Sequence, residues 1–315
     1  MTNSVRLGLT PWDMNYSAMA SQAALAEEWG YHSIWLPENH FTGDRAVADP
    51  LLLLASMAVG TTQLRLGTTS YLLPLRHPLQ AAEQVATLDQ LSGGRLILGL
   101  GRGYQAATYS AFGIPMRQKR AIFAQTLEIM QRAWAGEDMV MLEDAQPVRL
   151  GPLPYQQPHP PLWVAAFGPK ALAQVGALGL PYLASPVEGC DDLQTNYEQH
   201  RLAMTQAGHA APAAVPIMRT VYLSEDASEI RDLRAAIERN LQQQAQQAPA
   251  HLAKAALVPL DDQVIIGDAA TVVRQIERYQ ELLGVTHLIA TRPRVSGLTP
   301  QQLRLSAQRL PEILS

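Results

Sequence analysis

Cysteine is almost missing from this sequence, in which Cys190 is the one cysteine among 315 residues. A single cysteine excludes a disulfide within the chain and a cysteine metal cluster, and it fits a reducing compartment. The eight histidines are scattered, and neither His-x-His nor His-Glu-x-x-His occurs. From these absences we expect a cytoplasmic protein that holds no metal.

Clusters of basic residues and long apolar runs are also missing. The formal net charge is -4, so nucleic acid is not the expected partner. The apolar run at residues 51–60 is too short to span a bilayer, and the N-terminus shows no apolar signal core. Hydrophobic residues make up 47% of the chain and charged residues 17%, which is enough apolar material for a sizeable core.

Several well-known active-site motifs do not occur. There is no Gly-x-Ser-x-Gly elbow and no Walker phosphate loop. The first apolar run ends in Thr10-Pro11-Trp12 rather than in a glycine-rich turn. A doubly wound open sheet is therefore only the second choice of fold.

What the sequence does contain is a regular alternation of strand and helix patterns. We predict eight strands, at residues 5–10, 32–36, 65–69, 95–100, 162–166, 182–184, 215–223 and 286–290. We predict helices at residues 17–29, 50–58, 78 onward, 116–135, 169–178, 191–206, after Ser224, 268–283 and 300–310, with Asp49 and Ser224 as caps and Pro311 as a stop. This count favours an α/β fold, a single (β/α)8 TIM barrel over residues 1–315.

Two segments break the alternation. Residues 136–161 are rich in proline and follow the fourth helix, so we predict an insertion with at most a short hairpin. Residues 240–262 include a run of glutamines and precede the last strand and helix units. For this second segment we predict a mobile loop.

In a barrel of this kind, functional groups lie in the loops after the strands. Arg102 stands between two glycines after the fourth strand, where it could bind a phosphate or form a salt bridge with a neighbouring helix. Gly168-Pro169-Lys170 begins a helix, which suits an anion but also suits an ordinary solvated helix start. Spacing alone does not choose between these alternatives.

His40 follows the second strand and could act as a general acid or base. Glu38 could orient it, or could simply lie at the barrel rim. For His77 a structural role is favoured. Aromatic side chains at the strand ends suggest an apolar organic substrate or plain packing at the rim; they are Trp12, Phe41, Tyr71, Tyr104 and Phe167.

One block of the sequence runs from Leu73-Pro74-Leu75-Arg76-His77-Pro78 through residues 82–95 to Gly99-Leu100-Gly101-Arg102-Gly103-Tyr104. This block resembles the bacterial luciferase-like flavin monooxygenases. Trp35-Leu36-Pro37-Glu38-Asn39-His40-Phe41, Phe112-Gly113 and residues 284–288 also resemble that family. The similarity extends over residues 5–184 and 266–291.

The resemblance implies a (β/α)8 barrel, a homodimer, and FMN or a deazaflavin bound at the strand ends. It implies that the loop matching Ser70-Tyr71 holds a cis non-proline peptide beneath the flavin ring. The residues that it assigns to cofactor binding are Ser70, Tyr71, Arg102, Tyr104, Phe167, Gly168 and Lys170.

The sequence departs from the luciferases at two places. The luciferases carry two adjacent histidines after the glutamate, whereas this chain has Asn39 and His40. Where many FMN-binding members have a serine, this chain has Gly168. Both features are similar to those of the deazaflavin-dependent relatives, and we take His40 and Asn39 as the candidate catalytic residues.

The function that the resemblance implies most directly is a two-component monooxygenase. It would use reduced FMN, supplied by a separate NAD(P)H:flavin reductase, and O2 to oxidise a small apolar organic molecule. One alternative is a hydride-transfer oxidoreductase that uses the deazaflavin coenzyme F420. Another is a flavin-binding protein without catalytic activity.

Overall fold

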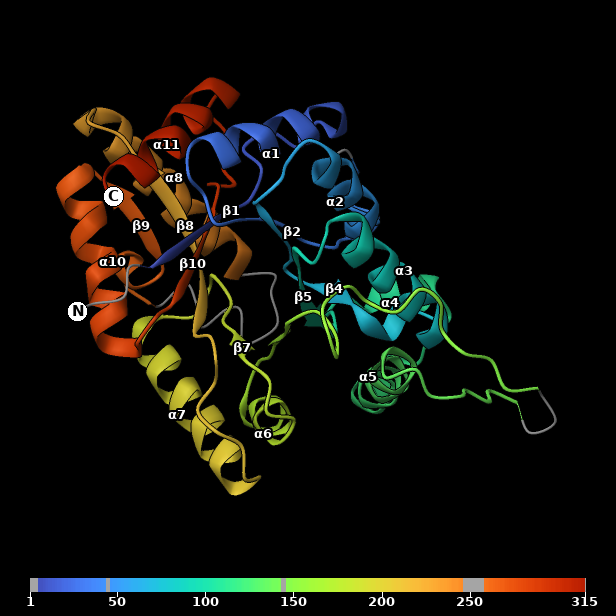
Figure 1. Cartoon of the computed structure of the whole chain (residues 1–315). Helices are drawn as coiled ribbons and strands as arrows, with labels where there is room; N and C mark the ends of the chain where they lie inside the picture. The colour runs from blue at the N-terminus through green and yellow to red at the C-terminus, as the bar shows by residue number, and fades with distance from the viewer. Residues whose placement is uncertain (1–4, 44–45, 143–145, 246–257, 315) are drawn as a thin grey trace. The chain divides into compact units, whose positions relative to one another are not determined.

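The computed structural model describes residues 5–43, 46–142, 146–245 and 258–314 (Figure 1). The chain divides into two compact units. The first unit contains residues 1–14, 25–34 and 166–315, and the second contains residues 15–24 and 35–165. Among the described helices, none is both long enough and apolar enough to cross a membrane.

The strands are β1 (Arg6–Leu9), β2 (Ser33–Leu36), β3 (Arg65–Thr68), β4 (Tyr71–Leu72), β5 (Leu96–Gly101), β6 (Leu162–Ala165), β7 (Tyr182–Leu183), β8 (Pro216–Leu223), β9 (Val264–Gly267) and β10 (His287–Thr291). The helices are α1 (Met19–Glu28), α2 (Pro50–Val59), α3 (Pro78–Leu91), α4 (Ala106–Ala111), α5 (Lys119–Trp134), α6 (Pro169–Ala177), α7 (Cys190–Gln206), α8 (Ala227–Ala245), α10 (Ala269–Leu283) and α11 (Pro300–Glu312). The predicted α/β class is confirmed.

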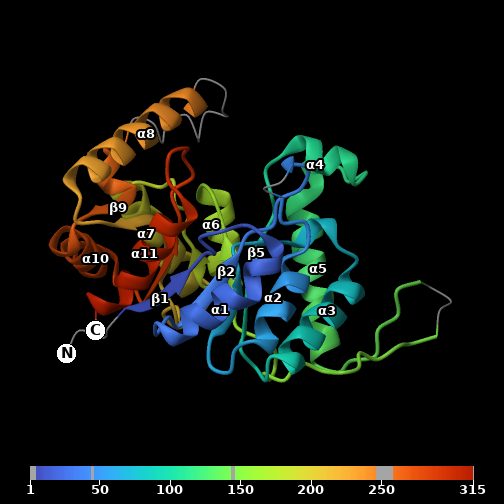
Figure 2. The ribbon, with the colours of Figure 1, turned by 90° about the horizontal axis from the view of Figure 1, so that it is seen from above.

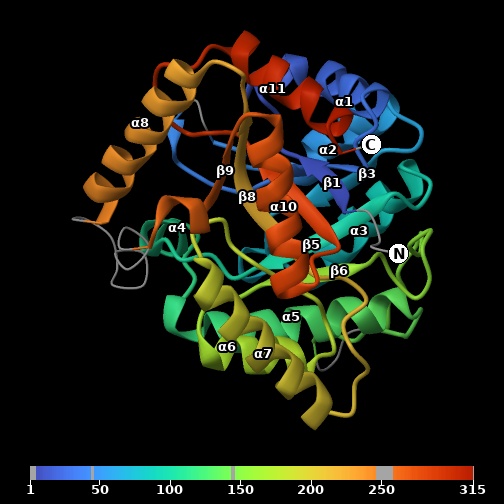
Figure 3. The same cartoon turned by 90° about the vertical axis from the view of Figure 1, so that its left-hand side faces the viewer.

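The first unit is built on parallel strands. β1 pairs with β10 from Arg6↔His287 to Leu9↔Ala290, and β10 pairs with β8. The far half of β8 pairs with β9, and Ala184 bridges to Ile217 in parallel. α6 packs against α7, and α10 packs against β9 (Figure 3). All residues of β9 and β10 are buried, as is typical of parallel strands with covered faces.

The second unit repeats the same arrangement around β5. β3, β4 and β6 all pair with β5 in parallel. α2, α3 and α5 pack in sequence, each against the next (Figure 2), and Trp134 Nε1 donates to the Ala82 carbonyl oxygen at 3.1 Å. Trp35 stacks on Trp163 at 4.9 Å between ring centroids. A Cβ at Gly67 would come within 2.1 Å of Trp35, so glycine is what allows this packing.

One of the two predicted capping residues is confirmed. Asp49 accepts a hydrogen bond from Leu52 N at 3.1 Å, which confirms it as the cap of α2. The predicted cap of α8 at Ser224 is wrong by two residues. The helix begins at Ala227, and Asp226 Oδ1 accepts from the backbone amides of Ser228 and Glu229 at 2.8 and 3.2 Å.

Two strands were not predicted. β4 has only two residues, and β9 lies between the predicted loop 240–262 and the predicted helix 268–283, where no element was predicted. Pro311 does not stop α11 at once, because the helix runs to Glu312. Of the segment 240–262, for which we predicted a mobile loop, residues as far as Ala245 are helical, and Leu260–Asp262 form a 3-10 turn. Residues 246–257 lie outside the described residues.

The proline-rich segment 136–161 follows α5, and its described residues form an extended arm (Figure 1, green). Its two legs are joined by an antiparallel bridge between Met139 and Val148. Gln156 anchors its base: the side-chain amide donates to Asp89 at 2.8 Å and to the Leu96 carbonyl oxygen at 2.9 Å. The described part of the arm therefore contains the predicted short hairpin contact.

Candidate functional site

The candidate site lies in the second unit, in the loops that follow β2, β3 and β5. Parallel strands place these loops at one edge of the sheet, since the carboxyl ends of parallel strands point the same way. Thr69 N donates to the Leu36 carbonyl oxygen at 2.7 Å, which joins the loops after β2 and β3. Thr68 Oγ1 donates to the Gly99 carbonyl oxygen at 2.7 Å and joins β3 to β5. The three loops are thus held together by the strands that precede them.

A buried carboxylate organises this edge. Glu38 Oε1 lies 2.7 Å from His40 Nε2 and accepts from Arg76 Nη2 at 2.8 Å. Its other oxygen, Oε2, accepts from the Leu72 amide at 2.9 Å. Burial raises the pKa of Glu38, while Arg76, the Leu72 amide and His40 act in the opposite direction. Of the two roles left open for Glu38, the geometry favours the orienting partner of His40.

The contacts of Glu38 also set the hydrogen-bonding role of His40. With Arg76 and Leu72 N donating to it, Glu38 acts as an acceptor, so His40 donates through Nε2–H. In the neutral imidazole, Nδ1 then carries the lone pair. His40 is 7% exposed, so the ring is held within the loops. A fixed ring with an available acceptor nitrogen is what a general base requires.

Asn39 has a different environment from His40. Its side-chain oxygen accepts from Thr42 Oγ1 at 2.9 Å and from Val47 N at 3.0 Å. Its backbone also pairs with Val47 in an antiparallel bridge. These contacts shape the loop after β2, and the catalytic role of Asn39 stays a prediction.

The loop after β3 contains the cis peptide that the resemblance implied. The peptide bond between Thr69 and Ser70 is cis, although the second residue of the pair is serine and not proline. A Cβ at Gly101 would lie 1.9 Å from Ser70 Oγ, so glycine at the end of β5 makes room for this loop. Tyr71 is fully buried, with its hydroxyl 3.1 Å from Gln84 Oε1 and the Arg76 guanidinium 4.6 Å from its ring centre. Burial raises the pKa of Tyr71 to about 12.

Arg102, after β5, belongs to a cluster of cations. Its guanidinium lies 4.8 Å from the centre of the Phe123 ring, and the residue is 8% exposed. Burial and the charge of Arg120 lower the pKa of Arg102. Lys119, whose ammonium donates to the Gly103 carbonyl oxygen at 3.1 Å, has a pKa lowered by burial and by the charges of Arg102 and Arg120. Cations that oppose one another's charge form a place suited to an anion.

Helix α4 joins the cation cluster to the His40 loop. The Tyr109 hydroxyl donates to the Arg102 carbonyl oxygen. Three residues on, the Phe112 ring meets His40 edge to face, with centroids 5.0 Å apart. Sequence reasoning missed α4, Phe112, Arg76, Lys119 and Arg120. For Lys119 and Arg120 a signal existed, since these two adjacent cations lie in the first turns of the helix predicted at residues 116–135 and they begin α5.

The remaining predicted cofactor residues are more exposed. Tyr104 is 60% exposed, and Phe167, in the first unit, is 44% exposed. Gly168 precedes α6 with a φ of 76°, and Lys170 on that helix is exposed. Their roles stay predictions. His77, for which we favoured a structural role, is exposed and immediately precedes α3.

The first unit has a buried polar network of its own. Arg219 is fully buried and donates to the Tyr279 hydroxyl at 2.8 Å and to the carbonyl oxygens of Ser185, Met218 and Glu188. The Glu188 carboxylate accepts from Tyr182, from Asn196 Nδ2 and from Ser185 N. Each of these donors is bonded inside the unit, which indicates a structural role.

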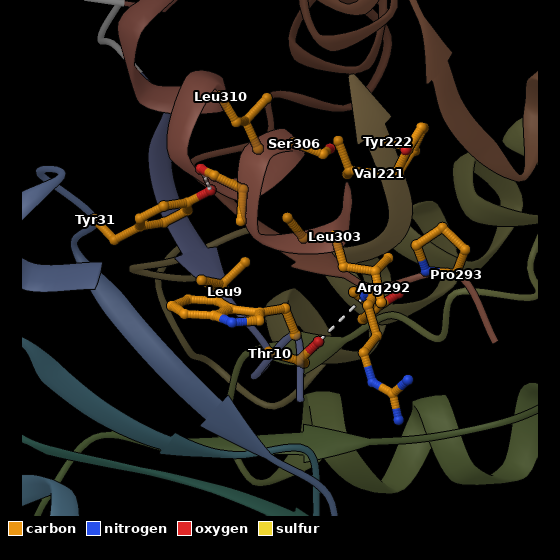
Figure 4. Close-up of a pocket in the computed structure, with 14 residues that line it drawn as sticks. Leu9, Thr10, Tyr31, Val221, Tyr222, Arg292, Pro293, Leu303, Ser306 and Leu310 are labelled. Carbon is orange, nitrogen blue, oxygen red and sulfur yellow. Dashed lines mark hydrogen bonds between the residues drawn. The ribbon is translucent and has the colours of Figure 1, made fainter. Parts of the chain in front are cut away.

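A pocket of the first unit lies between strand ends and α11 (Figure 4). Trp12, Thr10, Tyr222 and Leu303 are among its lining residues, and Thr10 Oγ1 accepts from Arg292 N at 3.3 Å. Its volume of about 20 Å³ suits a water molecule and not a flavin. Trp12 is thus a packing residue, stacked on Trp29 at 5.1 Å. Among the residues that the structure describes, no three His, Cys, Asp or Glu side chains are grouped to hold a metal.

Comparison with known proteins assigns the chain to one family. Residues 1–287 match the sequence model of the family described as luciferase-like monooxygenase. A relative from Acinetobacter baylyi, the oxygenase component of flavin-dependent trigonelline monooxygenase, is 31% identical over 160 residues, which are 50% of this chain and 44% of the relative. The chain spans about half to two thirds of the length of the curated relatives that it matches.

Solved structures show the same fold over the whole chain. The monooxygenase RslO1 from Streptomyces bottropensis is similar with a TM-score of 0.84 and 25% identity, covering 98% of each chain. The oxygenating constituent of 3,6-diketocamphane monooxygenase from Pseudomonas putida, solved with FMN, gives 0.83 and 19%, covering 99% and 98%. The coenzyme F420-dependent tetrahydromethanopterin reductase from Methanopyrus kandleri gives 0.71 and 20%, covering 100% of each chain.

Proposed function

The chain belongs to the luciferase-like monooxygenase family, and on that premise we propose that it is the oxygenase component of a two-component flavin monooxygenase. It would take reduced FMN from an NAD(P)H:flavin reductase and oxidise a small apolar organic molecule with O2. The observation that carries this proposal is the pair of groups that α4 joins. They are the Glu38–His40 pair and the cations around Arg102.

The residues present fit a flavin phosphate. A phosphate monoester carries up to two negative charges, and Arg102, Lys119 and Arg120 offer three positive charges, of which Arg120 lies close enough to lower the pKa of both Arg102 and Lys119. We assign the phosphate to Arg102 and Lys119. Glycine on either side of Arg102 lets the backbone approach the cofactor, and Gly103 has a φ of 68°. The sequence-based roles of Tyr104, Phe167, Gly168 and Lys170 remain part of the proposal.

Reduced flavin, when bound, supplies the electrons that activate O2. The chain's own residues hold the His40 ring and the neighbouring loop in place and transfer a proton. Glu38 fixes the His40 ring by accepting from Nε2–H, and Nδ1 of His40 receives or returns a proton at the reacting centre. Leu72 N binds the same carboxylate, so Glu38 also fixes the loop that follows the Thr69–Ser70 peptide. Arg76 balances the charge of Glu38 and keeps it an acceptor.

The supply of reduced flavin by a separate protein is part of the same proposal. The sequence shows no second nucleotide-binding motif with which the chain could reduce its own flavin. The relatives from Acinetobacter and Pseudomonas are named as an oxygenase component and an oxygenating constituent, which supports the division of labour.

A hydride-transfer enzyme dependent on F420 is the second candidate function. The single histidine before Phe41 and the glycine at position 168 favour it, as does the likeness of fold to an F420-dependent reductase. The phosphodiester of F420 carries a single negative charge, whereas the phosphate of FMN carries up to two. F420 would therefore neutralise less of the positive charge of Arg102, Lys119 and Arg120. The cation cluster therefore favours FMN. A flavin-binding protein without turnover stays the third alternative.

Two further predictions remain in the proposal. One is that residues 1–315 form a single (β/α)8 barrel with an insertion at 136–161, which the whole-chain likeness to RslO1 supports. The other is a homodimer. α2 is apolar nearly all round, yet Leu52 and Val59 on it are 71% and 79% exposed. A second copy of the chain packed on this helix would cover both, and the mass in solution checks it.

A cofactor titration tests the function most directly. We expect FMN to bind at least roughly tenfold more tightly than riboflavin, because a charge-assisted phosphate contact adds about 1.5–3 kcal/mol. Lys119→Gln should shrink that ratio severalfold. Arg117→Ala is the matched control, since this exposed cation is absent from the charges that lower the pKa of Arg102. Binding of F420 tighter than that of FMN would instead establish the second candidate function.

A further inference from the structure

Three aromatic rings stand together on the rim of the candidate site. The His40 ring lies 5.0 Å from Phe112 with an interplanar angle of 70°, and 5.9 Å from Phe41 at 42°. Phe41 and Phe112 are 6.1 Å apart at 45°. These are the separations at which aromatic rings attract one another edge to face or tilted. The three rings therefore form one cluster, which we call the rim cluster.

The rim cluster leaves two apolar rings largely uncovered. Phe41 is 69% exposed and Phe112 is 41% exposed, whereas His40 beside them is 7% exposed. Phe41 is also the one non-glycine residue with positive φ among the described residues, at 59°. Adjacent exposed aromatic side chains beside a buried polar pair are typical of a ligand-binding surface. A bound molecule would cover the two rings and meet His40.

His40 adds a polar requirement to this surface. Its Nε2 is used by Glu38, whose oxygens also accept from Arg76 and Leu72 N. The remaining nitrogen, Nδ1, is an acceptor in the neutral ring and pairs best with a donor on the ligand. A hydroxyl is the simplest donor that an otherwise apolar molecule can carry.

From these contacts we infer that the substrate is a planar aromatic molecule that bears a hydroxyl group. Its ring would lie against Phe41 and Phe112, and its hydroxyl would donate to His40 Nδ1. The inference rests on the proposed function, since it names the substrate class of the same site. It concerns substrate recognition, so it can fail while the flavin-dependent function stands.

A saturated substrate would use this surface less well. A saturated ring or chain covers apolar area, and its gain comes from that area alone. An aromatic ring covers the same area and also interacts with the quadrupoles of the two phenyl rings. The expected preference is therefore for aromatic over saturated molecules of equal size.

Matched probes separate these contributions. 2-Naphthol and decahydro-2-naphthol share skeleton and hydroxyl and differ in aromaticity. 2-Naphthol and 2-methoxynaphthalene share the aromatic rings and differ in the hydroxyl donor. We would measure their dissociation constants by calorimetry, with and without FMN. We expect 2-naphthol to bind about threefold to tenfold more tightly than each of the other two.

Variants assign each preference to its residue. Phe41→Leu with Phe112→Leu keeps the apolar character of the surface and should bring the aromatic-to-saturated ratio close to one. His40→Phe should remove the preference for 2-naphthol over 2-methoxynaphthalene and leave the other ratio in place. Tyr155→Leu is the control, an aromatic residue 60% exposed on the proline-rich arm and outside the rim cluster. It should change neither ratio.

Two results would overturn the inference. One is equal binding of 2-naphthol and decahydro-2-naphthol to the wild-type protein. The other is an aromatic preference that survives the double Phe→Leu change. Because each ratio is taken within one protein sample, a partly unfolded variant does not alter it. FMN binding, measured in the same samples, reports on the proposed function separately.

Discussion

Glu38 in the second unit and Glu188 in the first are buried glutamates that accept the same number of hydrogen bonds. Each carboxylate accepts hydrogen bonds from two side chains and one backbone amide. Each has an arginine nearby, Arg76 for Glu38 and Arg219 for Glu188. Burial raises the pKa of both carboxyl groups.

The two sites differ in what surrounds the carboxylate. Glu188 accepts from Tyr182 and Asn196, which are neutral, and Arg219 uses its donors on carbonyl oxygens and on Tyr279. Glu38 accepts from a histidine whose second nitrogen is still available, and that histidine touches two exposed aromatic rings.

This difference shows what distinguishes a reactive site from a structural one here. Burial and a shifted pKa are common to both sites and do not identify function. Among the described residues around Glu38, His40 can exchange a proton. It lies next to the exposed rings of Phe41 and Phe112, which a ligand can cover. The Glu188 network is closed, and its expected role is to hold the loop after β7. Three experiments test this contrast.

We expect the largest effect from a substitution that removes Arg219 from the network around Glu188. Arg219→Leu removes the buried hydrogen bonds that Arg219 donates to Ser185, Met218, Glu188 and Tyr279, so the free energy of unfolding should fall by about 3–5 kcal/mol. Urea unfolding followed by circular dichroism measures it. Arg309→Leu, which removes an exposed ion pair with Glu225, is the control and should cost about 1 kcal/mol or less. A loss below about 1 kcal/mol for Arg219→Leu would show that the network is not structural.

The second experiment concerns turnover. Glu38→Gln keeps the size and an acceptor oxygen but loses the charge that fixes His40. We expect oxygen consumption with reduced FMN and substrate to slow by roughly 100-fold, with little change in FMN affinity. Glu83→Gln, on the exposed side of α3, is the control.

If Glu38 acts through His40, the two residues form one unit. His40→Ala should lower turnover more than it lowers flavin affinity, and adding Glu38→Gln to it should have little further effect. Additive losses in the double variant would assign Glu38 a separate role. Unchanged turnover in His40→Ala would remove His40 from the chemistry.

The sequence predicted the longer helices and the long strands, though not the short α4, because their patterns are local. The Asp49-Pro50 start of α2 and the alternation that gave the α/β class depend on a few neighbouring residues. β4 was missed because two residues hold no pattern, and their pairing with β5 is a long-range contact. The Ser224 cap was placed too early because the sequence offers both Ser224 and Asp226 as caps.

For the site, the sequence indicated His40, Glu38 and Arg102 from their places after strands. Arg76 and Phe112 lie in segments that resemble the family, but no role was predicted for them; they are 36 and 72 residues from His40 in sequence. Both reach the site through the packing of other elements, η3 (Leu73–Leu75) before Arg76 and α4 before Phe112. Contacts of this kind depend on the fold, and the spacing of neighbouring residues in the sequence does not predict them.

The smallest effect, and the finest test of the contrast, is the dependence of stability on pH. A carboxyl group whose folded pKa is raised adds to the free energy of unfolding below its unfolded pKa, and this contribution is lost as pH rises through the folded pKa. Wild-type protein should therefore lose stability relative to Glu188→Gln as the pH rises from about 4 to about 7. Glu38→Gln should show a smaller change of the same sign, because the Arg76 ion pair opposes the effect of burial. Urea unfolding at the two pH values measures both differences. A larger change for Glu38 than for Glu188 would mean that Arg76 does not balance the buried charge as the geometry indicates.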